Sequence, residues 1–279
     1  MFVLMFHRVL PQSLIKCPSA YSTFGTLISQ EYFETILEML IANGFKFFTI
    51  SELENLNQTQ KCVALTFDDG YSDNFDYVIP SLLKFGINAS FFPIVNPCKH
   101  NEALPLDFYY QYVDDSEFSD SLRDDYIKGN TKRNFYWSNP ERQKELLKIL
   151  FDKSFEKIRI KYLTAEQIKY MSDLGMEIGS HSMSHSLLTA DYMDNEKISL
   201  ELELSKEWLE NITMQSVNSF CFPAGAYNDR IIQMAKDVGY SSVVLVSKNL
   251  NSRPCLPSYD RFFVKQDSLV DLKSYLNII

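Results

Sequence analysis

The stretch from Cys62 to Phe67, followed by Asp68-Asp69-Gly70, constrains the fold of this chain more than any other feature. The run CVALTF is apolar and rich in β-forming residues, which is typical of a strand buried on both faces. It ends at two adjacent carboxylates and a glycine, a combination that favours a turn. Because α/β folds carry their chemistry at the carboxyl ends of parallel strands, the stretch predicts an acidic pair at a functional edge of a sheet.

Strand-like and helix-like patterns alternate on both sides of this stretch. Apolar positions from Phe75 to Leu83 recur at helical spacing, and Gly86 closes them before another strand-like run. Pro80 lies within this helical pattern and predicts a kink or a late start of the helix. Such alternation implies right-handed crossovers and a parallel sheet, closed or nearly closed into a barrel. Strands are predicted at residues 3–6, 45–49, 62–67, 87–95, 176–179, 219–222, 241–246 and 261–264.

Capping residues predict where several helices begin and end. Ser29 caps a helix that Gly44 ends, and residues 51–54 form the capping-box start of a short helix. Residues 164–167 form another capping box. Residues 247–260 contain two prolines and are predicted to be a loop. Further helices are predicted near residues 196–211, 229–238 and 269–276.

Residues 97–160 interrupt the alternation. The stretch is acidic at first, contains several tyrosines and ends in a helical pattern of leucines. It is too long and too aromatic for a plain loop. We therefore expect one domain, residues 1–279, with a largely helical insertion at residues 97–160. Because the insertion leaves from a strand end on the same edge as Asp68, it is a lid over the site, or else a packing appendage or a homodimer surface.

Two histidines form the second candidate feature of the sequence. Of the four histidines in the chain, His181 and His185 stand four residues apart directly after a short strand-like run. A single histidine on an apolar face is usually a core residue, and an aspartate pair alone is equally well explained as a helix cap. Two histidines at this spacing can converge on one metal ion, which one aspartate completes as a two-histidine, one-carboxylate site. An iron oxygenase uses the same ligands, but it leaves the second residue of the Asp68-Asp69 pair without a role.

Two motifs together make the sequence similar to a known family. Residues 66–70, read as TFDDG, and residues 181–185, read as HSMSH, resemble the first two motifs of the polysaccharide deacetylases that share the NodB homology domain, also called carbohydrate esterase family 4. Residues 222–225, read as FPAG, resemble the third motif, and residues 86–92 match the strand after the first helix. The resemblance covers residues 1–96 and 161 to about 265. It implies a distorted, partly open (β/α)7-type barrel.

The resemblance implies a metal ion and a set of catalytic roles. Asp69, His181 and His185 are expected to hold one divalent ion, Zn²⁺ in the first place with Co²⁺ or Ni²⁺ as alternatives. Asp68, next to a ligand but free of the metal, is expected to be the general base. His7 is expected to be the general acid, because family members that begin with a similar strand look circularly rearranged and carry that histidine there.

The third motif departs from the family pattern. The resemblance implies that the motif, with Pro223 and a backbone N–H near Ala224, helps to hold the oxyanion. Many members place an arginine before this proline to pair with the base, but residues 217–222 contain none. We expect Arg261 to take that role, with Arg8 as the alternative. Since an aromatic residue is common where Ala224 stands, the substrate groove is expected to differ.

The implied function is removal of an N-acetyl or other N-acyl group from an amino sugar, in a glycan or in a nucleotide- or lipid-linked precursor of a surface polysaccharide. Other activities of the same scaffold remain as alternatives: deformylation and the hydrolysis of cyclic amides or imides, some without metal. A glycan-binding protein without catalytic activity is the alternative of a different class. It predicts that Asp68→Asn leaves the biological function intact.

Charge and cysteine content narrow the partners and the location. A net charge of −9 and a pI near 5.0 argue against nucleic acid or an anionic membrane as the main partner. Five cysteines without a CxxC pair fit reduced thiols, and Cys62 and Cys221 fit core positions. The first apolar run is too short for a signal peptide, and no stretch approaches the roughly 18 apolar residues of a membrane span. We therefore expect a cytoplasmic protein without stable membrane insertion.

Overall fold

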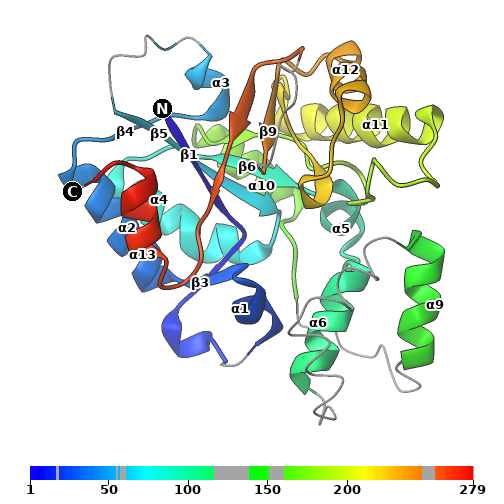
Figure 1. Cartoon of the computed structure of the whole chain (residues 1–279), viewed down its shortest axis with the longest axis horizontal. Helices are drawn as coiled ribbons and strands as arrows, with labels where there is room; N and C mark the ends of the chain where they lie inside the picture. Colours follow the sequence, from blue (N-terminus) through cyan, green and yellow to red (C-terminus); the bar gives the residue numbers. More distant parts are fainter. Residues whose placement is uncertain are drawn as a thin grey trace.

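Strands lie at the centre of the molecule and helices surround them, as Figure 1 shows. The structure is a computed structural model that describes residues 1–16, 19–54, 56, 61–115, 138–150, 160–246 and 255–278. All strand pairings within its sheets are parallel. The α/β class with a parallel arrangement is therefore confirmed.

The described strands form three sheets. The largest has the order β11-β1-β5-β6-β7, and β4 also pairs with β5. The second has the order β10-β9-β8, and the third pairs β2 with β3. The strand bounds are β1 Phe2–Phe6, β2 Arg8–Leu10, β3 Leu27–Ser29, β4 Lys46–Phe47, β5 Cys62–Asp69, β6 Ser90–Pro93, β7 Glu177–Ile178, β8 Ser219–Cys221, β9 Ser242–Leu245, β10 Ser258–Asp260 and β11 Phe262–Phe263.

The two larger sheets are joined at two places. A parallel bridge between Ser180 and Phe220 links the chain after β7 to β8. On the other side, β10 pairs with β9 and β11 pairs with β1, so residues 258–263 pass from one sheet to the other. Arg261 lies at this transition, and its N–H donates to the carbonyl of Leu245 at 3.1 Å. The strands thus curve into a distorted, partly open barrel, while the described residues form no single closed sheet.

Helices cover the outside of this barrel and bury their apolar sides against it. In α2, the predicted stripe of Phe33, Ile36, Leu37 and Leu40 is fully buried. The helix bounds are α1 Ala20–Phe24, α2 Gln30–Ala42, α3 Ile50–Leu53, α4 Ile79–Phe85, α5 Val95–His100, α6 Pro105–Asp115, α9 Pro140–Leu150, α10 Ala165–Asp173, α11 Asn195–Thr213, α12 Asp229–Val238 and α13 Leu269–Tyr275. No helix in the described ranges combines the length and the apolar character that crossing a membrane requires.

Pro80 has the effect that the sequence predicted. The chain forms a π-helical turn at Asn74–Val78, and regular α-helix begins at Ile79 with Pro80 in its first turn. Proline is tolerated there because its missing N–H has no intrahelical partner in any case. The late start of the helix is confirmed.

The predicted start of the short helix after β4 is wrong by two residues. Thr49, not Ser51, is the N-cap of α3. The Glu52 carboxylate accepts a hydrogen bond from the Thr49 N–H at 2.7 Å, which completes the capping box. Ser51 instead donates to the carboxylate of Glu177 at 2.6 Å. Ser51, which the local pattern predicts to be the N-cap, therefore makes a tertiary contact with β7 instead.

The loop prediction for residues 247–260 is also wrong at its end. Residues 258–260 form β10, which pairs with β9. Residues 247–254 lie outside the described residues. The short strands β2 and β3 were not predicted, because three residues are too few to show a periodicity.

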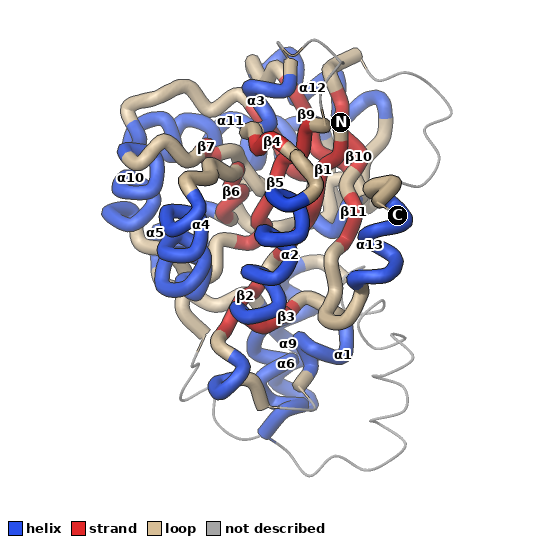
Figure 2. Tube along the Cα trace, turned by 90° about the vertical axis from the view of Figure 1, so that its left-hand side faces the viewer, coloured by secondary structure: helices blue, strands red, loops and turns tan. Residues whose placement is uncertain are grey.

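The described part of the predicted insertion is helical. It contains α6, α9 and all but the first two residues of α5. Figures 1 and 2 both show α6 and α9 side by side at one end of the molecule, close to α1. The buried Asp107 of α6 accepts hydrogen bonds from the hydroxyls of Tyr21, Tyr71 and Tyr162, which fasten α6 to the barrel. Residues 116–137 and 151–159, which the lid and dimer predictions also concern, lie outside the described residues.

Candidate active site

The acidic pair stands at the carboxyl end of β5. Asp69 has a φ of 73° and Gly70 a φ of 75°, so the backbone turns sharply as it leaves the sheet. A Cβ on Gly70 would lie 2.8 Å from the Cβ of Pro93 in the neighbouring strand, which only glycine avoids. The turn leaves Asp68 buried and Asp69 partly accessible.

Asp68 forms a buried ion pair with Arg261. The guanidinium donates from Nη1 to Oδ1 at 2.7 Å and from Nη2 to Oδ2 at 2.8 Å, a bidentate arrangement. Burial raises the pKa of Asp68, but Arg261 and His181 outweigh burial and hold this pKa below its usual value. Asp68 is therefore ionised, as a general base must be. Arg8, the other arginine considered for this role, instead pairs with Asp73 at 2.7 Å.

The side chains of Asp69, His181 and His185 converge on one point. Asp69 Oδ1 lies 3.5 Å from Nε2 of His181 and 3.8 Å from Nε2 of His185. These separations are long for hydrogen bonds. Two ligand atoms at about 2.0–2.1 Å from a tetrahedral ion lie about 3.4 Å apart, so the spacing fits a shared cation. The donor set of two imidazoles and one carboxylate suits a divalent transition metal.

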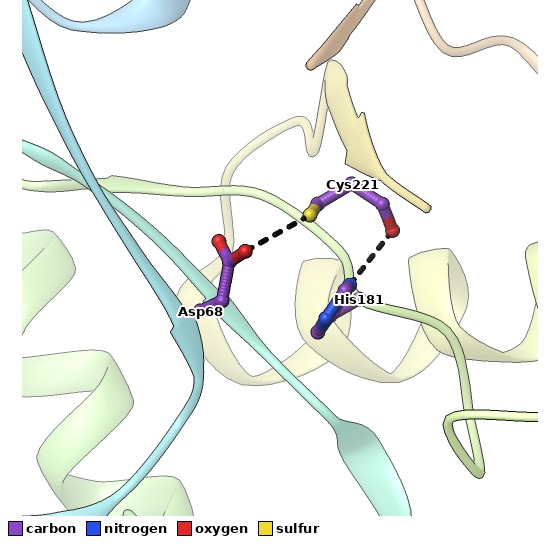
Figure 3. Close-up of side chains that lie close together, drawn as sticks. All are labelled: Asp68, His181 and Cys221. Atoms are coloured by element: carbon purple, nitrogen blue, oxygen red, sulfur yellow. Dashed lines mark hydrogen bonds between the residues drawn. The ribbon is translucent and has the colours of Figure 1, made fainter. Parts of the chain in front are cut away.

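A hydrogen bond orients His181 for such a role. Its Nδ1 lies 2.8 Å from the backbone carbonyl of Cys221, the contact drawn in Figure 3. A carbonyl only accepts hydrogen bonds, so Nδ1 carries a proton and Nε2 is the ring nitrogen that faces Asp69. Burial lowers the pKa of His181, but Cys221 and Asp69 raise it well above the usual value. The site therefore stabilises one additional positive charge, supplied either by a proton on His181 or by a metal ion.

The second histidine is held by the loop that follows β7. Burial, followed by the charge of His181, lowers the pKa of His185 to about 4, so its imidazole is neutral near pH 7. Ser182 and His185 both have positive φ values, 67° and 60°. The carboxylate of Glu201 in α11 accepts hydrogen bonds from the N–H groups of Met183 and Ser184 at 3.0 and 2.9 Å. Thus a carboxylate from a separate helix fixes the tight turn that His185 needs.

His7 lies between β1 and β2 and faces the same site. Asn74 donates to its backbone carbonyl at 2.8 Å, and the ring of Phe263 packs edge-on at a centroid distance of 5.3 Å. Its Nδ1 is buried and has no hydrogen-bond partner among the described residues. Burial lowers the pKa of His7, although Asp69 and Asp68 act in the opposite direction.

The third motif forms a tight turn at the site. Pro223–Gly225 is a short 3₁₀ turn in which Ala224 has a φ of 52°. The N–H of Gly225 donates to the backbone carbonyl of Phe222 at 2.9 Å, and the N–H of Ala226 donates to the carbonyl of Pro223 at 3.1 Å. Within this turn, Ala224 is therefore the residue whose N–H we consider for oxyanion binding.

All of the predicted site residues except Pro223 line one cavity. Its volume is about 430 Å³, and Pro223 is buried next to it. Aromatic side chains form much of the remaining wall, as is common in sites that bind sugar rings through their apolar faces. The lining residues are Met5, His7, Tyr21, Phe24, Thr26, Asp68, Asp69, Tyr71, Leu106, Tyr110, His181, His185, Phe222, Ala224, Gly225, Val246, Arg261 and Phe263.

A second group of ligand-type side chains shares His181. Asp68, His181 and Cys221 lie close together, as Figure 3 shows. The Cys221 Sγ lies 3.5 Å from Asp68 Oδ2. The two oxygens of Asp68 are already engaged by Arg261, whose Nη2 also donates to the Cys221 Sγ at 3.1 Å. A cation adjacent to the guanidinium would be repelled. We therefore favour the group that contains Asp69 and His185 as the metal ligands.

Sequence reasoning missed several residues at the site. Cys221 was assigned to the core, and it is buried, but its thiol contacts both members of the Asp68–Arg261 pair. Its place at the carboxyl end of a strand, directly before the third motif, was the available signal. Tyr71 follows the acidic pair in the sequence and lines the cavity, which was a similar signal. No local pattern connects Asp107 to its tyrosines.

Comparison with known proteins identifies the family of these motifs. The sequence model of the polysaccharide deacetylases matches residues 55–243. The protein YxkH of Bacillus subtilis (strain 168), named for the same family, is 22% identical over 256 residues. These residues make up 90% of this chain and 66% of YxkH, so the chain spans just under two thirds of that relative.

Solved structures share the fold. IcaB from Ammonifex degensii has a TM-score of 0.65 at 20% identity, covering 99% of this chain and 96% of IcaB. The Streptococcus pyogenes deacetylase PplD, solved in complex with acetate, has a TM-score of 0.63 at 19% identity, covering 95% and 92% of the two chains. The polysaccharide deacetylase BC0361 from Bacillus cereus has a TM-score of 0.64 at 19% identity, covering 99% and 68%. At these identities the likeness shows the fold alone, and it agrees with the distorted α/β barrel described above.

Proposed function

Because the chain belongs to the polysaccharide deacetylase family, we propose that it is a metal-dependent hydrolase that removes an N-acetyl group from an amino sugar. One observation supports this proposal most directly. In a single cavity, a carboxylate and two imidazoles converge beside a second carboxylate that is paired with a buried guanidinium. Asp69 could therefore bind the metal while the adjacent Asp68 acts as the general base.

The residues that would hold the metal are Asp69, His181 and His185. A divalent ion held there supplies a Lewis acid that lowers the pKa of water and polarises the acyl carbonyl. Zn²⁺ suits this donor set, and Co²⁺ and Ni²⁺ suit it as well. The chain contributes the pre-set orientation of His181, which its hydrogen bond to Cys221 fixes before any ligand arrives.

Asp68 would take the proton from water. The bidentate contact with Arg261 keeps the carboxylate ionised and fixes its direction. Thr66 shares the same guanidinium at 3.2 Å, so the arginine is itself held in place. A general base that is ionised and immobile loses little entropy when the reaction begins.

His7, as imidazolium, would donate a proton to the leaving amine; the charges of Asp69 and Asp68 favour this protonated form, and burial opposes it. Its buried Nδ1, without a partner among the described residues, leaves the imidazole free to interact with substrate. Ala224 would donate its N–H to the oxyanion from the left-handed turn of the third motif. The products are acetate and a free amino sugar.

We place the reaction in the cytoplasm, where the substrate would be a precursor of a surface polysaccharide. The five cysteines without a CxxC pair, which fit reduced thiols, support this location. Cell fractionation tests it, and recovery of the protein outside the cytoplasm would contradict it.

Metal analysis and acetate release test the activity. The purified protein is expected to carry about one equivalent of Zn²⁺, Co²⁺ or Ni²⁺ and to release acetate from N-acetylated sugars. Asp68→Asn is expected to lower kcat by about 10²- to 10⁴-fold while the metal content stays the same. Asp76→Asn is the matched control, because Asp76 is exposed in the turn that follows the acidic pair.

Each result that contradicts the proposal favours one of the alternative functions. Protein that hydrolyses the amide without metal would restore the metal-free amidohydrolase. Full activity in Asp68→Asn would remove the assigned base. Glycan binding without any hydrolysis in the metal-loaded protein would restore the binding protein.

A further inference from the structure

A second and larger cavity adjoins the candidate metal centre. Its volume is about 750 Å³, against about 430 Å³ for the first. His185 lines both cavities, so one side chain of the metal centre separates them. The walls of the second cavity come from the segment around α5 and α6, from α9 and from residues 160–161 and 184–186. Figure 1 shows α6 and α9 next to each other.

The charge of this cavity is opposite to that of the chain. Lys144, Lys148 and Lys161 line it, and Glu102 is the only carboxylate among the lining residues that the structure describes. Lys144 and Lys148 are one helical turn apart on α9 and so share a face. In a chain with a net charge of −9, three lysines around one hollow make a local site for an anion.

The other polar groups of the wall suit the oxygens of a phosphate. Asn96, Asn101 and Gln143 provide amide donors, and Ser184 and Ser186 provide hydroxyls. Lysine ammonium groups bind phosphate as point charges. A neutral glycan offers these ammonium groups no counter-charge.

The position of the cavity fits the chemistry of activated amino sugars. In a 2-acetamido sugar that is activated at its anomeric carbon, the phosphate is attached to the carbon next to the one that carries the acetamide. When the acetamide lies at Asp69 and His185, the phosphate must therefore lie only a few bonds away. The second cavity lies on the other side of His185, so it is close enough to the proposed acetamide position to receive the phosphate.

We propose that the lysine-lined cavity binds the phosphate or diphosphate of an amino sugar, so that the substrate is a phosphate-linked precursor rather than a neutral polymer. This inference rests on the proposed function for the nature of the sugar. The phosphate site itself can be tested by binding alone.

The test compares two probes that differ only by a phosphate. N-acetylglucosamine 1-phosphate and methyl N-acetylglucosaminide are titrated by calorimetry into the metal-loaded Asp68→Asn protein, which does not consume them. We expect the phosphate compound to lose about tenfold or more in affinity when Lys144, Lys148 and Lys161 are all changed to Gln. The neutral compound is expected to bind equally before and after. Raising the salt concentration is expected to weaken only the phosphate compound.

A matched control lies on the same helix. Arg142 of α9 pairs with Glu145 at 3.0 Å and does not line the cavity, so Arg142→Gln removes one charge without touching the site. It is expected to leave both affinities unchanged. Because all three lysines are exposed, the triple variant is expected to fold, which thermal unfolding verifies.

The outcomes separate this inference from the proposed function. Equal binding of the phosphate compound to parent and triple variant would overturn the inference, since the phosphate would then lie elsewhere, such as at the metal. Lysine-dependent binding of the neutral compound would overturn it as well. Lysine-dependent phosphate binding in a wild type that releases no acetate would support the inference and contradict the proposed function. Nucleotide-linked and prenyl-linked forms of the sugar, used as further probes, distinguish the two carriers.

Discussion

The buried pair of Asp68 and Arg261 makes a prediction at the scale of one residue. Arg261→Gln leaves Asp68 buried without its cation, and because burial alone raises the pKa of this carboxyl, its pKa rises. The acidic limb of the pH profile of kcat/KM is therefore expected to move to higher pH, with smaller movement for Arg261→Lys, which keeps the charge but loses the bidentate contact.

The Arg8–Asp73 pair is the control for this prediction. Arg8 is also buried beside an aspartate, at 2.7 Å, so Arg8→Gln should destabilise the fold without moving the acidic limb. An acidic limb that moves with Arg8 and stays fixed with Arg261 would contradict the assignment of the base and its partner.

Asp107 gives a prediction for stability against pH. Burial raises its pKa to about 6, although the Tyr162 and Tyr21 hydroxyls act to lower it. The folded state therefore favours the protonated carboxyl, and the stability that this group contributes below pH 4 is lost as the pH rises through about 6. The shift from 3.8 to about 6 is about two pKa units, or about 3 kcal/mol at about 1.4 kcal/mol each.

The variant Asp107→Asn cannot ionise and should lack this loss. Relative to wild type, its free energy of unfolding is expected to rise by about 3 kcal/mol between pH 4 and pH 7. Urea unfolding of the metal-free proteins at several pH values measures the difference. A difference that does not change with pH would show that Asp107 has an ordinary pKa in the fold.

Residues that act through local spacing could be predicted from the sequence, and residues that act through distant contacts could not. His181 and His185 stand in one short motif, so their spacing could suggest a shared metal ion, although the turn that brings them together also depends on Glu201 of α11. Arg261 could only be weighed against Arg8, because the choice depends on tertiary contacts: Arg261 reaches Asp68, whereas Arg8 pairs with Asp73. The tyrosines around Asp107 come from three separate parts of the chain and have no common pattern.

At the scale of the elements, the junction of β7 and β8 depends on a glycine. A Cβ on Gly179 would lie 2.4 Å from a ring carbon of Phe92 and 2.5 Å from the hydroxyl oxygen of Ser219. Gly179→Ala is therefore expected to cost about 1–3 kcal/mol through overpacking. Because His181 follows two residues later, it should also weaken metal binding.

A second glycine separates this effect from backbone strain. Gly86 has a φ of 65° at the end of α4, and a Cβ there would meet no atom within 4 Å. Gly86→Ala is expected to cost about 1 kcal/mol and to leave metal affinity unchanged. Chemical unfolding and metal titration of both variants check the pair, and equal loss of metal affinity in the two would contradict the role given to Gly179.

The elements themselves were largely predictable, since long amphipathic helices and buried strands have strong periodicity. The predictions failed where tertiary contacts override local signals. Ser51 looked like an N-cap until Glu177 engaged it. Residues 258–260 looked like part of a loop, yet pairing with β9 makes them a strand.

At the scale of the whole molecule, a metal ion at the proposed site should stabilise the fold. The proposed ligands come from β5 and from the loop after β7, so an ion at Asp69, His181 and His185 would tie together segments that are far apart in the sequence. At a hundredfold excess over Kd, Zn²⁺ is expected to add about 2.7 kcal/mol to the free energy of unfolding. Differential scanning calorimetry should show a higher Tm for the wild type and for Asp76→Asn, but not for Asp69→Asn. An equal rise in all three would place the stabilising ion elsewhere.

Because residues 258–263 lie near the end of the sequence, the order of synthesis determines when the site is completed. Ribosomes make a chain from its first residue onward, and domains fold as their parts emerge. The acidic pair and both histidines are synthesised well before Arg261, so a growing chain holds all of them while Asp68 still lacks its counter-charge. The segment that supplies this guanidinium also links β9 to β1. Hydrolytic activity is therefore expected only late in synthesis, when residues 258–263 join the two larger sheets.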